Sequence, residues 1–368
     1  MKKLIHSFVI IVCLLLVATS KLYANEPPSE TVIKAWEQFA DQFLADKNAD
    51  KKVLDAETER ILNNKRLSYE AKDSLVMIKE SEFTKKWNAE LLKRLKAKPE
   101  YEGALKITQK LMDHNTSYSN ACDIWNKQVL AKDPDAYQNI IEGIQVDYPF
   151  KNEWEAKFIQ LVNETPEMLD YPSSLIEDVC GIQVCNSADR KLKCYSWDYY
   201  NGGSAVCSCY FEQFLMSDGN VKVPVIMEEN IPWGIEADPN DEDSPWDRTM
   251  PWEWQKNVEK IITIDTGIWT VYLLESTLHG GFSRTYNCID AKVISGDKCL
   301  DFPIFSVDGE MLTGLETAAI AEFKYDKKTK TLTFDEYEEG DEYVENVGWF
   351  RLKGKARYVL EGSAFRKR

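Results

Sequence analysis

The pattern of hydrophobic and polar positions changes near the middle of the chain. Over residues 29 to about 168, large apolar residues recur every three or four positions, which is the period of an amphipathic helix. The clearest run consists of Val32, Trp36, Phe39 and Phe43. This half predicts an irregular bundle of about six or seven helices, each of roughly 10–18 residues.

The second half of the chain has the pattern of β-strands. Short runs rich in Val, Ile, Tyr and Thr alternate with turn residues such as Asn, Asp and Gly. The change occurs around NETPEMLDYPSS, which contains Pro166 and Pro172. The sequence therefore predicts an α+β protein, with an α-helical domain over 25–168 and an antiparallel β domain over 174–368. We expect about ten strands in a sandwich or a partly closed barrel.

The first residues, MKKLIHSFVIIVCLLLVATSKLYANE, have the three parts of a secretory signal peptide. Lys2 and Lys3 precede an apolar run from Phe8 to Ala18, and cleavage is expected after Ala24. Cys13 lies inside the apolar run and not at its end, so a lipoprotein is not expected. The sequence predicts a protein of the bacterial periplasm or a secreted protein.

The chain is acidic, with a formal net charge of −16. Removal of a signal peptide over 1–24 would take away three lysines and no acid, which makes the charge −19. Nucleic acids and anionic lipids would repel such a protein, so neither is an expected partner. No later apolar run is long enough for a membrane helix, so no membrane insertion is expected after cleavage.

The part of the chain after the signal peptide has an even number of cysteines, and an even number in an exported chain predicts disulfide bonds. Seven of them lie in the β half. The set is Cys122, Cys180, Cys185, Cys194, Cys207, Cys209, Cys288 and Cys299.

One pairing can be predicted from a turn. If Asn201-Gly202 forms a two-residue type I′ turn, Cys194 lies directly opposite Cys209 at a disulfide-compatible spacing. A turn at Gly202-Gly203 would make the two cysteines diagonal neighbours. Proximity in sequence then suggests the pairs Cys180–Cys185 and Cys288–Cys299, with Cys122 and Cys207 as a link between the domains.

Metal and redox chemistry are weaker interpretations of these cysteines. Zinc sites use two close cysteine pairs or added histidines, and the β half contains only His279. A thioredoxin-like centre needs a C-x-x-C motif at the start of a helix, which is absent. We expect neither a metal nor a cofactor.

The same predicted hairpin places large aromatic residues on the face opposite the cysteines. They are Tyr195, Trp197, Tyr199 and Tyr210. Such a row favours burial against a second sheet, because aromatic side chains dominate β-sandwich interiors. The alternative is an exposed surface on which sugar rings or a partner's side chains could stack.

The segment 231–255, IPWGIEADPNDEDSPWDRTMPWEWQ, concentrates tryptophans among prolines and acids. Tryptophan beside carboxylates is typical of sugar sites and of interface hot spots. An ordered loop held by its tryptophans, with solvated acids, is an equal alternative. The acids of 238–243 could also bind calcium, although the turn glycine and final glutamate of an EF-hand are missing. The candidate binding residues are Trp233, Trp246, Trp252 and Trp254.

The string IITIDTGIW contains Asp265-Thr266-Gly267 after an apolar strand, and it resembles the active-site turn of aspartic proteases. The resemblance implies that Asp265 is one of two carboxylates that share a proton, the second coming from another copy of the chain. Ile268 departs from the small residue that the family places after the glycine. A hairpin turn explains the same string.

His279 is the second catalytic candidate. The run STLHGGFSRTY brings it near Ser276 and Ser283, and a serine hydrolase needs a serine, a base and an orienting acid. There is no G-x-S-x-G motif. A turn between two strands, centred on the Gly-Gly pair, explains the run equally well.

Taken together, these patterns predict a non-enzymatic exported protein that binds an envelope protein or a glycan. The tryptophan-rich segment 231–255 would provide the contact surface. The alternative is an envelope hydrolase, acting on glycan or peptide, that uses Asp265 or His279 with nearby acids.

Overall fold

The computed structural model describes residues 28–132, 151–200, 206–223, 256–280, 284–344 and 348–368. The predicted signal peptide over 1–24 and the tryptophan-rich segment 231–255 lie outside these ranges. The described part of the chain confirms an α+β protein in which helices precede antiparallel sheets. The sheets remain open and are stacked, so the sandwich alternative holds and the barrel alternative does not.

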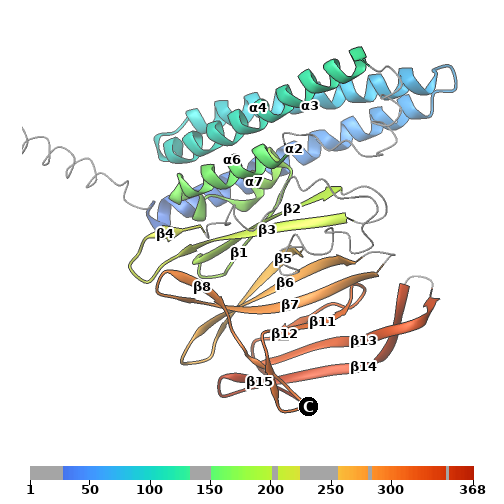
Figure 1. Ribbon diagram of the computed structural model, residues 1–368. Helices are drawn as coiled ribbons and strands as arrows, with labels where there is room; N and C mark the ends of the chain where they lie inside the picture. Colours follow the sequence, from blue (N-terminus) through green and yellow to red (C-terminus); the bar gives the residue numbers. More distant parts are fainter. Residues whose placement is uncertain (1–27, 133–150, 201–205, 224–255, 281–283, 345–347) are drawn as a thin grey trace, which may run out of the picture.

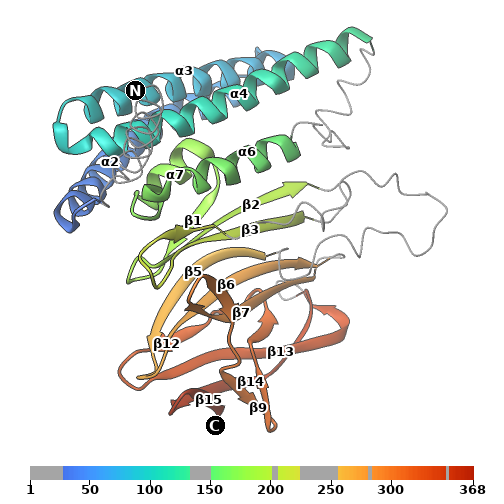
Figure 2. The same ribbon diagram turned by 60° about the vertical axis from the view of Figure 1, so that its left-hand side comes forward.

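The described elements form four layers (Figures 1 and 2). Helices make the first layer, and three sheets follow in chain order. We call them the helix-facing sheet, the middle sheet and the outer sheet. In the described ranges the strand pairs are antiparallel, except for the parallel pairing of β9 with β15.

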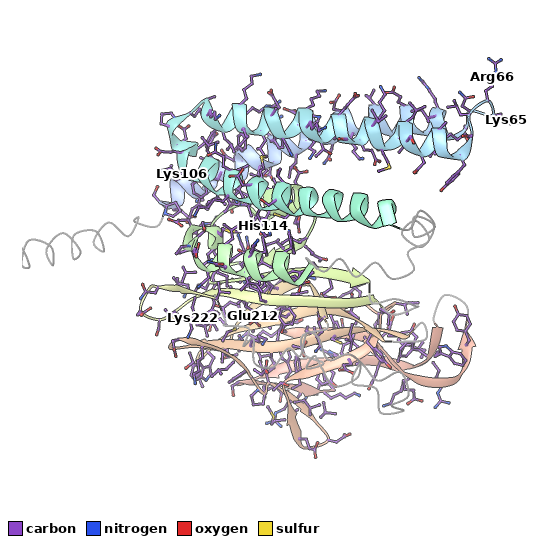
Figure 3. The ribbon with its side chains drawn as sticks, turned by 45° about the horizontal axis from the view of Figure 1, so that its top comes forward. Lys65, Arg66, Lys106, His114, Glu212 and Lys222 are labelled. Atoms are coloured by element: carbon purple, nitrogen blue, oxygen red, sulfur yellow. The ribbon has the colours of Figure 1, made fainter. Side chains whose placement is uncertain are left out.

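Three long helices form the outer part of the helical layer: α2 (Glu30–Leu62), α3 (Tyr69–Lys96) and α4 (Glu102–Lys132). Ser29 and Ser68 cap the first two, because each hydroxyl accepts a hydrogen bond from the backbone three residues ahead. The helices have 33, 28 and 31 residues, so they are longer than the predicted segments. The α2–α3 turn, where Lys65 and Arg66 lie, is at the far end of this layer (Figure 3).

Shorter helices connect this layer to the sheets. A 3₁₀ turn, η1 (Pro99–Tyr101), leads into α4. The segments α6 (Lys151–Asn163), η2 (Pro166–Leu169) and α7 (Ser173–Cys180) then lie between the long helices and the first sheet (Figure 2). Gly181 ends α7 in the left-handed conformation, with φ of 67°, and the chain continues directly into β1.

The strands follow in three groups. The helix-facing sheet has the order β1-β2-β3-β4, with β1 (Gln183–Asn186), β2 (Leu192–Tyr200), β3 (Val206–Leu215) and β4 (Val221–Lys222). The middle sheet has the order β11-β7-β6-β5, and β8 also pairs with β7. Its strands are β5 (Lys256–Asp265), β6 (Thr270–Gly280), β7 (Arg284–Ser295), β8 (Lys298–Asp301) and β11 (Gly314–Ala318). The outer sheet has the order β10-β9-β15-β14-β13-β12: β9 (Phe305–Val307), β10 (Glu310–Leu312), β12 (Lys324–Asp326), β13 (Thr331–Val344), β14 (Gly348–Glu361) and β15 (Ala364–Lys367).

The helix-facing sheet is covered on both faces. Each side chain of 192–197 is at most 7% exposed. In β2, Tyr195 and Trp197 pack in the cluster shared with the helices, whereas Leu192 and Cys194 pack against the middle sheet. Successive side chains of a strand point to opposite faces, so one strand contributes to two cores.

The core between the helices and the first sheet is rich in aromatic rings. Phe158 of α6 is fully buried, and its ring lies 5.9 Å from Tyr195 and 6.1 Å from Phe211. His114 of α4 packs on the same ring at 5.7 Å (Figure 3). Burial lowers the pKa of His114 to about 4, so its imidazole is neutral and packs as one more ring. This single cluster spans the predicted junction between the two halves of the chain.

A second core joins the middle and outer sheets. It includes Val271 and Leu273 of β6, Phe305 of β9, and Phe334 and Tyr358 of the long β13–β14 pair. Its rings stack, as between Phe334 and Tyr358 at 6.0 Å. Because the middle sheet contributes to this core and to the core with the first sheet, it is also packed on both faces.

The β2–β3 hairpin differs from the predicted one. Tyr200 pairs with Val206, so five residues connect the strands and not two. The register is therefore shifted by three residues: Cys194 lies opposite Glu212, and Cys209 lies opposite Trp197. An odd shift moves one strand's side chains to the other face.

The ring cluster at Phe158 generates a stability prediction. Phe158→Ala should lower the free energy of unfolding by about 3–5 kcal/mol, because it opens a cavity among packed rings. Tyr69→Ala is the matched control, since Tyr69 is 75% exposed. That variant should change stability by no more than about 0.5 kcal/mol. Urea unfolding followed by circular dichroism measures both, and a loss below about 1 kcal/mol for Phe158→Ala would contradict this packing.

Candidate functional site

The ends of several strands meet at one end of the layered structure, which we call the loop end. Tyr200 of β2 lies opposite Val206 of β3, Gly280 of β6 lies opposite Arg284 of β7, and Val344 of β13 lies opposite Gly348 of β14. In Figure 1 these ends lie on the right-hand side. The loop end therefore collects connections from all three sheets.

Contacts between the layers fix this arrangement. The backbone N–H of Val258, near the start of β5, donates to the Ser196 hydroxyl of β2 at 3.0 Å. The rings of Tyr286 in β7 and Phe350 in β14 lie 5.2 Å apart, edge to face. The first contact joins the middle of β2 to the start of β5, and the second joins the starts of β7 and β14, so the three sheets are held together by contacts between neighbouring layers.

An exposed aromatic side chain, that of Tyr343, lies near the end of β13 and contacts the half-buried Trp349 at the start of β14. Tyr343 is 59% exposed, and its ring packs edge to face on Trp349 at 5.9 Å. Leu352, also 59% exposed, follows on β14. An aromatic pair that keeps a solvent-facing side is typical of binding surfaces.

The predicted tryptophan-rich segment joins the described structure at the loop end. Lys256, the first residue of β5, lies opposite Leu278 near the end of β6. Its ammonium group is paired with Asp290 at 2.8 Å. Trp233, Trp246, Trp252 and Trp254 themselves lie outside the described residues, so the structure does not test them.

The predicted aromatic face is a core surface. Tyr195 is 0% exposed and donates its hydroxyl to Gln213 at 2.8 Å, and Trp197 is 7% exposed and donates its indole N–H to Glu155 at 2.8 Å. Both pack against helices and not against a second sheet. The side chain of Tyr199 lies outside the described residues. Tyr210 was predicted on this face but packs on the cysteine-bearing one, because of the register shift.

The predicted disulfide pairs are not those that the fold brings together. Cys194 and Cys209 are three register steps apart, which corresponds to about 10 Å along the strand. Cys180 packs in the helix-side core and Cys185 on the other face of the same sheet. The predicted bond between Cys194 and Cys209 was therefore wrong because of the strand register. The predicted bond between Cys180 and Cys185 was wrong because the two residues lie on opposite faces of the sheet.

The third predicted pair fails for reasons of distance along the sheet. Cys299 of β8 lies opposite Ile294 of β7, whereas Cys288 lies six residues earlier on β7, about 20 Å away. The side chains of Cys122 and Cys207 lie outside the described residues. The cysteines whose side chains are described are free thiols: Cys180, Cys185, Cys194, Cys288 and Cys299.

The two catalytic candidates lie far apart. Asp265 is exposed in the β5–β6 turn, where its carboxylate accepts a hydrogen bond from the Gly267 N–H at 2.7 Å. Thr270 of β6 lies opposite Asp265, and His279 follows nine residues later on that strand, so about 30 Å separates them. The Asp-Thr-Gly string forms a plain hairpin turn, and the two groups cannot belong to one site.

A charged and thiol-rich layer lies between the helix-facing and middle sheets. Glu212 of β3 pairs with Lys292 of β7 at 2.9 Å, and Lys292 also pairs with Asp301 at 3.2 Å. Nearby are the thiols of Cys194 and Cys299. Burial in this layer raises the pKa of both thiols, so they are protonated. The pairing of each charge makes this layer a structural one.

The hollow surface on the helical layer holds no convergent free groups. Between α2 and α3 a shallow cavity of about 540 Å³ is lined by Asp46, Asp50, Lys86, Trp87 and Arg94, among others. Asp46 pairs with Arg94 and Asp50 pairs with Lys86. Its charges are thus already neutralised within the protein.

In the described ranges, no group of three or more His, Cys, Asp or Glu side chains could hold a metal ion. Among the helices that the structure describes, none is both long and apolar enough to cross a membrane.

Comparison with known proteins adds no functional information. The chain matches no protein-family model, no curated protein and no solved structure. The candidate site therefore depends on the chain's own geometry. Tyr343 and Trp349 were missed from the sequence, although two aromatic residues flanking an acidic turn in DEYVENVGWF could have indicated them.

The most unusual buried group is Lys193 of β2. Its ammonium group is 0% exposed and donates to the carbonyls of Met168 at 2.6 Å and Tyr171 at 2.5 Å. It thereby ties the strand to η2 and to the start of α7. Burial lowers the pKa of Lys193 to about 7, while the nearby carboxylates of Asp170 and Glu37 act in the opposite direction.

This lowered pKa predicts a pH dependence of stability. Between pH 7 and 10.5 the unfolded chain binds a proton at Lys193 that the folded protein does not, so this residue makes stability rise with pH in that window. The free energy of unfolding of the wild type minus that of Lys193→Met should therefore increase from pH 7 to 9, by up to about 1.4 kcal/mol per pH unit. Urea titrations at several pH values measure it. A difference that stays constant would show that the two carbonyls keep the ammonium charged.

Proposed function

We propose that the chain is an exported, non-enzymatic binding protein of the bacterial envelope, which recognises its partner at the loop end. The observation that carries the proposal is the convergence of strand ends from three stacked sheets beside the exposed Tyr343, which packs on the half-buried Trp349. Export is inferred from the signal-like first 24 residues of the sequence.

The layered core provides a rigid support for such a surface. Binding residues concentrate on connections that a packed scaffold positions, as at one end of immunoglobulin-like sandwiches. Here the helix-facing and middle sheets are each packed on both faces. Connections at their ends can therefore vary without disturbing the core.

Aromatic residues support the loop end as the contact surface. Tyr343 and Trp349 are in place on β13 and β14. In the sequence, Trp254 and Trp252 come two and four residues before Lys256. Tryptophan and tyrosine are the residues most enriched in interface hot spots.

The charge around the aromatic pair indicates the kind of partner. The stretch 335–345 contains seven acids and no basic residue, in a chain of net charge −16. Two of these acids are paired with basic residues of β14 and β15, Glu336 with Lys353 and Lys367 and Glu338 with Arg351, and the other five make the stretch acidic. A protein surface with basic groups would be attracted to it, whereas nucleic acid would be repelled. A basic envelope protein is thus the first partner class, and a glycan is the second.

No observation in the described structure favours the hydrolase alternative. Asp265 and His279 lie at opposite ends of β6, and Asp265 is engaged in its own turn. A hydrolytic site requires its acid, base and nucleophile within hydrogen-bond reach of one substrate position.

The proposal predicts a different effect for aromatic residues at the two ends of the structure. Tyr343→Ala with Trp349→Ala should weaken binding at least about tenfold, because they remove hot-spot aromatics. Trp269→Ala is the matched control, since Trp269 is 41% exposed in the β5–β6 turn at the opposite end. The midpoint of thermal unfolding should change little in the double variant and in the control variant.

The measurement uses the wild-type protein as bait against envelope extract and an immobilised glycan panel, followed by titration with the purified partner. Binding lost in the double variant and kept in Trp269→Ala supports the loop end. Equal affinity for all three proteins, or loss only in Trp269→Ala, would contradict it.

A further inference from the structure

The fold brings two cysteines into direct register that sequence proximity does not pair. Cys185 of β1 lies opposite Cys194 of β2. Both pack in the core between the helix-facing and middle sheets. We propose that Cys185 and Cys194 form a disulfide bond when the chain folds in contact with a disulfide oxidant.

The ladder gives these cysteines a suitable spacing. The N–H of Ser187 donates to the Leu192 carbonyl at 2.8 Å, which makes 187 and 192 a hydrogen-bonded pair. Hydrogen-bonded pairs recur every two residues, so Cys185 and Cys194 are also such a pair, with Cα atoms about 5.5 Å apart. Disulfides accept Cα separations of about 4.4–6.8 Å.

The side chains already face each other. Both side chains lie on the face of the helix-facing sheet that packs against the middle sheet, and burial, followed by the Cys185 thiol, raises the pKa of the Cys194 thiol. The Cys185 thiol also donates to the Val258 carbonyl of the middle sheet at 3.6 Å. The structure therefore describes the reduced form of a pair whose sulfur atoms are neighbours.

Among the described thiols, Cys299 is the competing partner. It packs in the same core, on the middle sheet. Packed sheets are separated by about 10 Å, which exceeds the Cα separation that a disulfide accepts, so a bond from Cys194 to Cys299 would pull the layers together. Cys180 lies on the other face of the sheet, and Cys288 lies about 20 Å along β7 from Cys299.

The reaction is a pair of thiol–disulfide exchanges. One protein thiolate attacks the oxidant's disulfide and releases one reduced thiol, and the second protein thiolate then attacks the mixed disulfide and releases the other. Two protein S–H bonds are lost, one S–S bond forms, and the oxidant takes up both electrons and both protons. Because Cys194 is 0% exposed in the folded protein, exchange must precede the closure of the middle sheet over β1 and β2.

The first test concerns geometry alone. The purified chain is unfolded in urea with reductant and then refolded with oxidised glutathione. The refolded protein is denatured in the presence of N-ethylmaleimide, which alkylates free thiols. Its disulfide links are then mapped without reduction by tandem mass spectrometry. We expect a Cys185–Cys194 link in the wild type and in the control variants Cys180→Ser and Cys299→Ser. Reduction should lower the thermal midpoint by roughly 5 °C, because the link constrains the unfolded chain. A Cys194–Cys299 link, or both thiols alkylated in refolded protein, would overturn the proposal.

The second test separates this bond from the proposed function. Closure in the cell depends on the export proposed above, whereas closure in the refolding test does not. Protein taken from the native envelope fraction should carry the same link. If the link forms on refolding but the cellular protein has free thiols, the disulfide proposal stands and the export proposal fails.

Discussion

The structure depends on one sheet that is covered on both faces. An antiparallel sheet commonly packs one face and leaves the other to solvent, which gives alternating apolar and polar residues. Strand β2 instead reads LKCYSW over 192–197, with every side chain at most 7% exposed. Helices cover one face and the middle sheet covers the other (Figure 1).

This double coverage explains the polar groups inside the protein. Lys193 cannot reach solvent, so it donates to two carbonyls of the segment that leads into α7. Ser196 accepts the Val258 N–H and thereby joins the first two sheets. Buried polar groups must find partners within the protein, and here each partner belongs to the next layer. The same hydrogen bonds that satisfy these groups hold the helix-facing sheet to the helical segments on one side and to the middle sheet on the other.

Much of the architecture could be predicted from local patterns. The change from a helical to a strand period near Pro166 and Pro172 indicated the α+β order. The turn at Asp265–Gly267 was also readable as a hairpin, because Asp, Thr and Gly supply turn hydrogen bonds. Helix lengths were underestimated, since α2, α3 and α4 each continue through polar residues such as Asp46, Asp50 and Asn88.

Long-range features could not be predicted in this way. The register of the β2–β3 hairpin depends on a five-residue connection, and an error of three residues changed every cross-strand partner of Cys194. The pairing of β1 with β2 placed Cys185 opposite Cys194, and the stacking of the middle and outer sheets brought Tyr286 to Phe350. The aromatic pair at Tyr343 and Trp349 was missed because only the fold shows that the two rings meet and that Tyr343 stays exposed.

Native-state hydrogen exchange tests the double coverage of the helix-facing sheet most directly. Exchange of backbone amides reports how far each segment must open to meet water. The account predicts that peptides covering 192–197 and 210–214 exchange among the slowest in the protein, and far more slowly than the exposed edge strand β10 (Glu310–Leu312). Exchange of 192–197 as fast as that of β10 would contradict it.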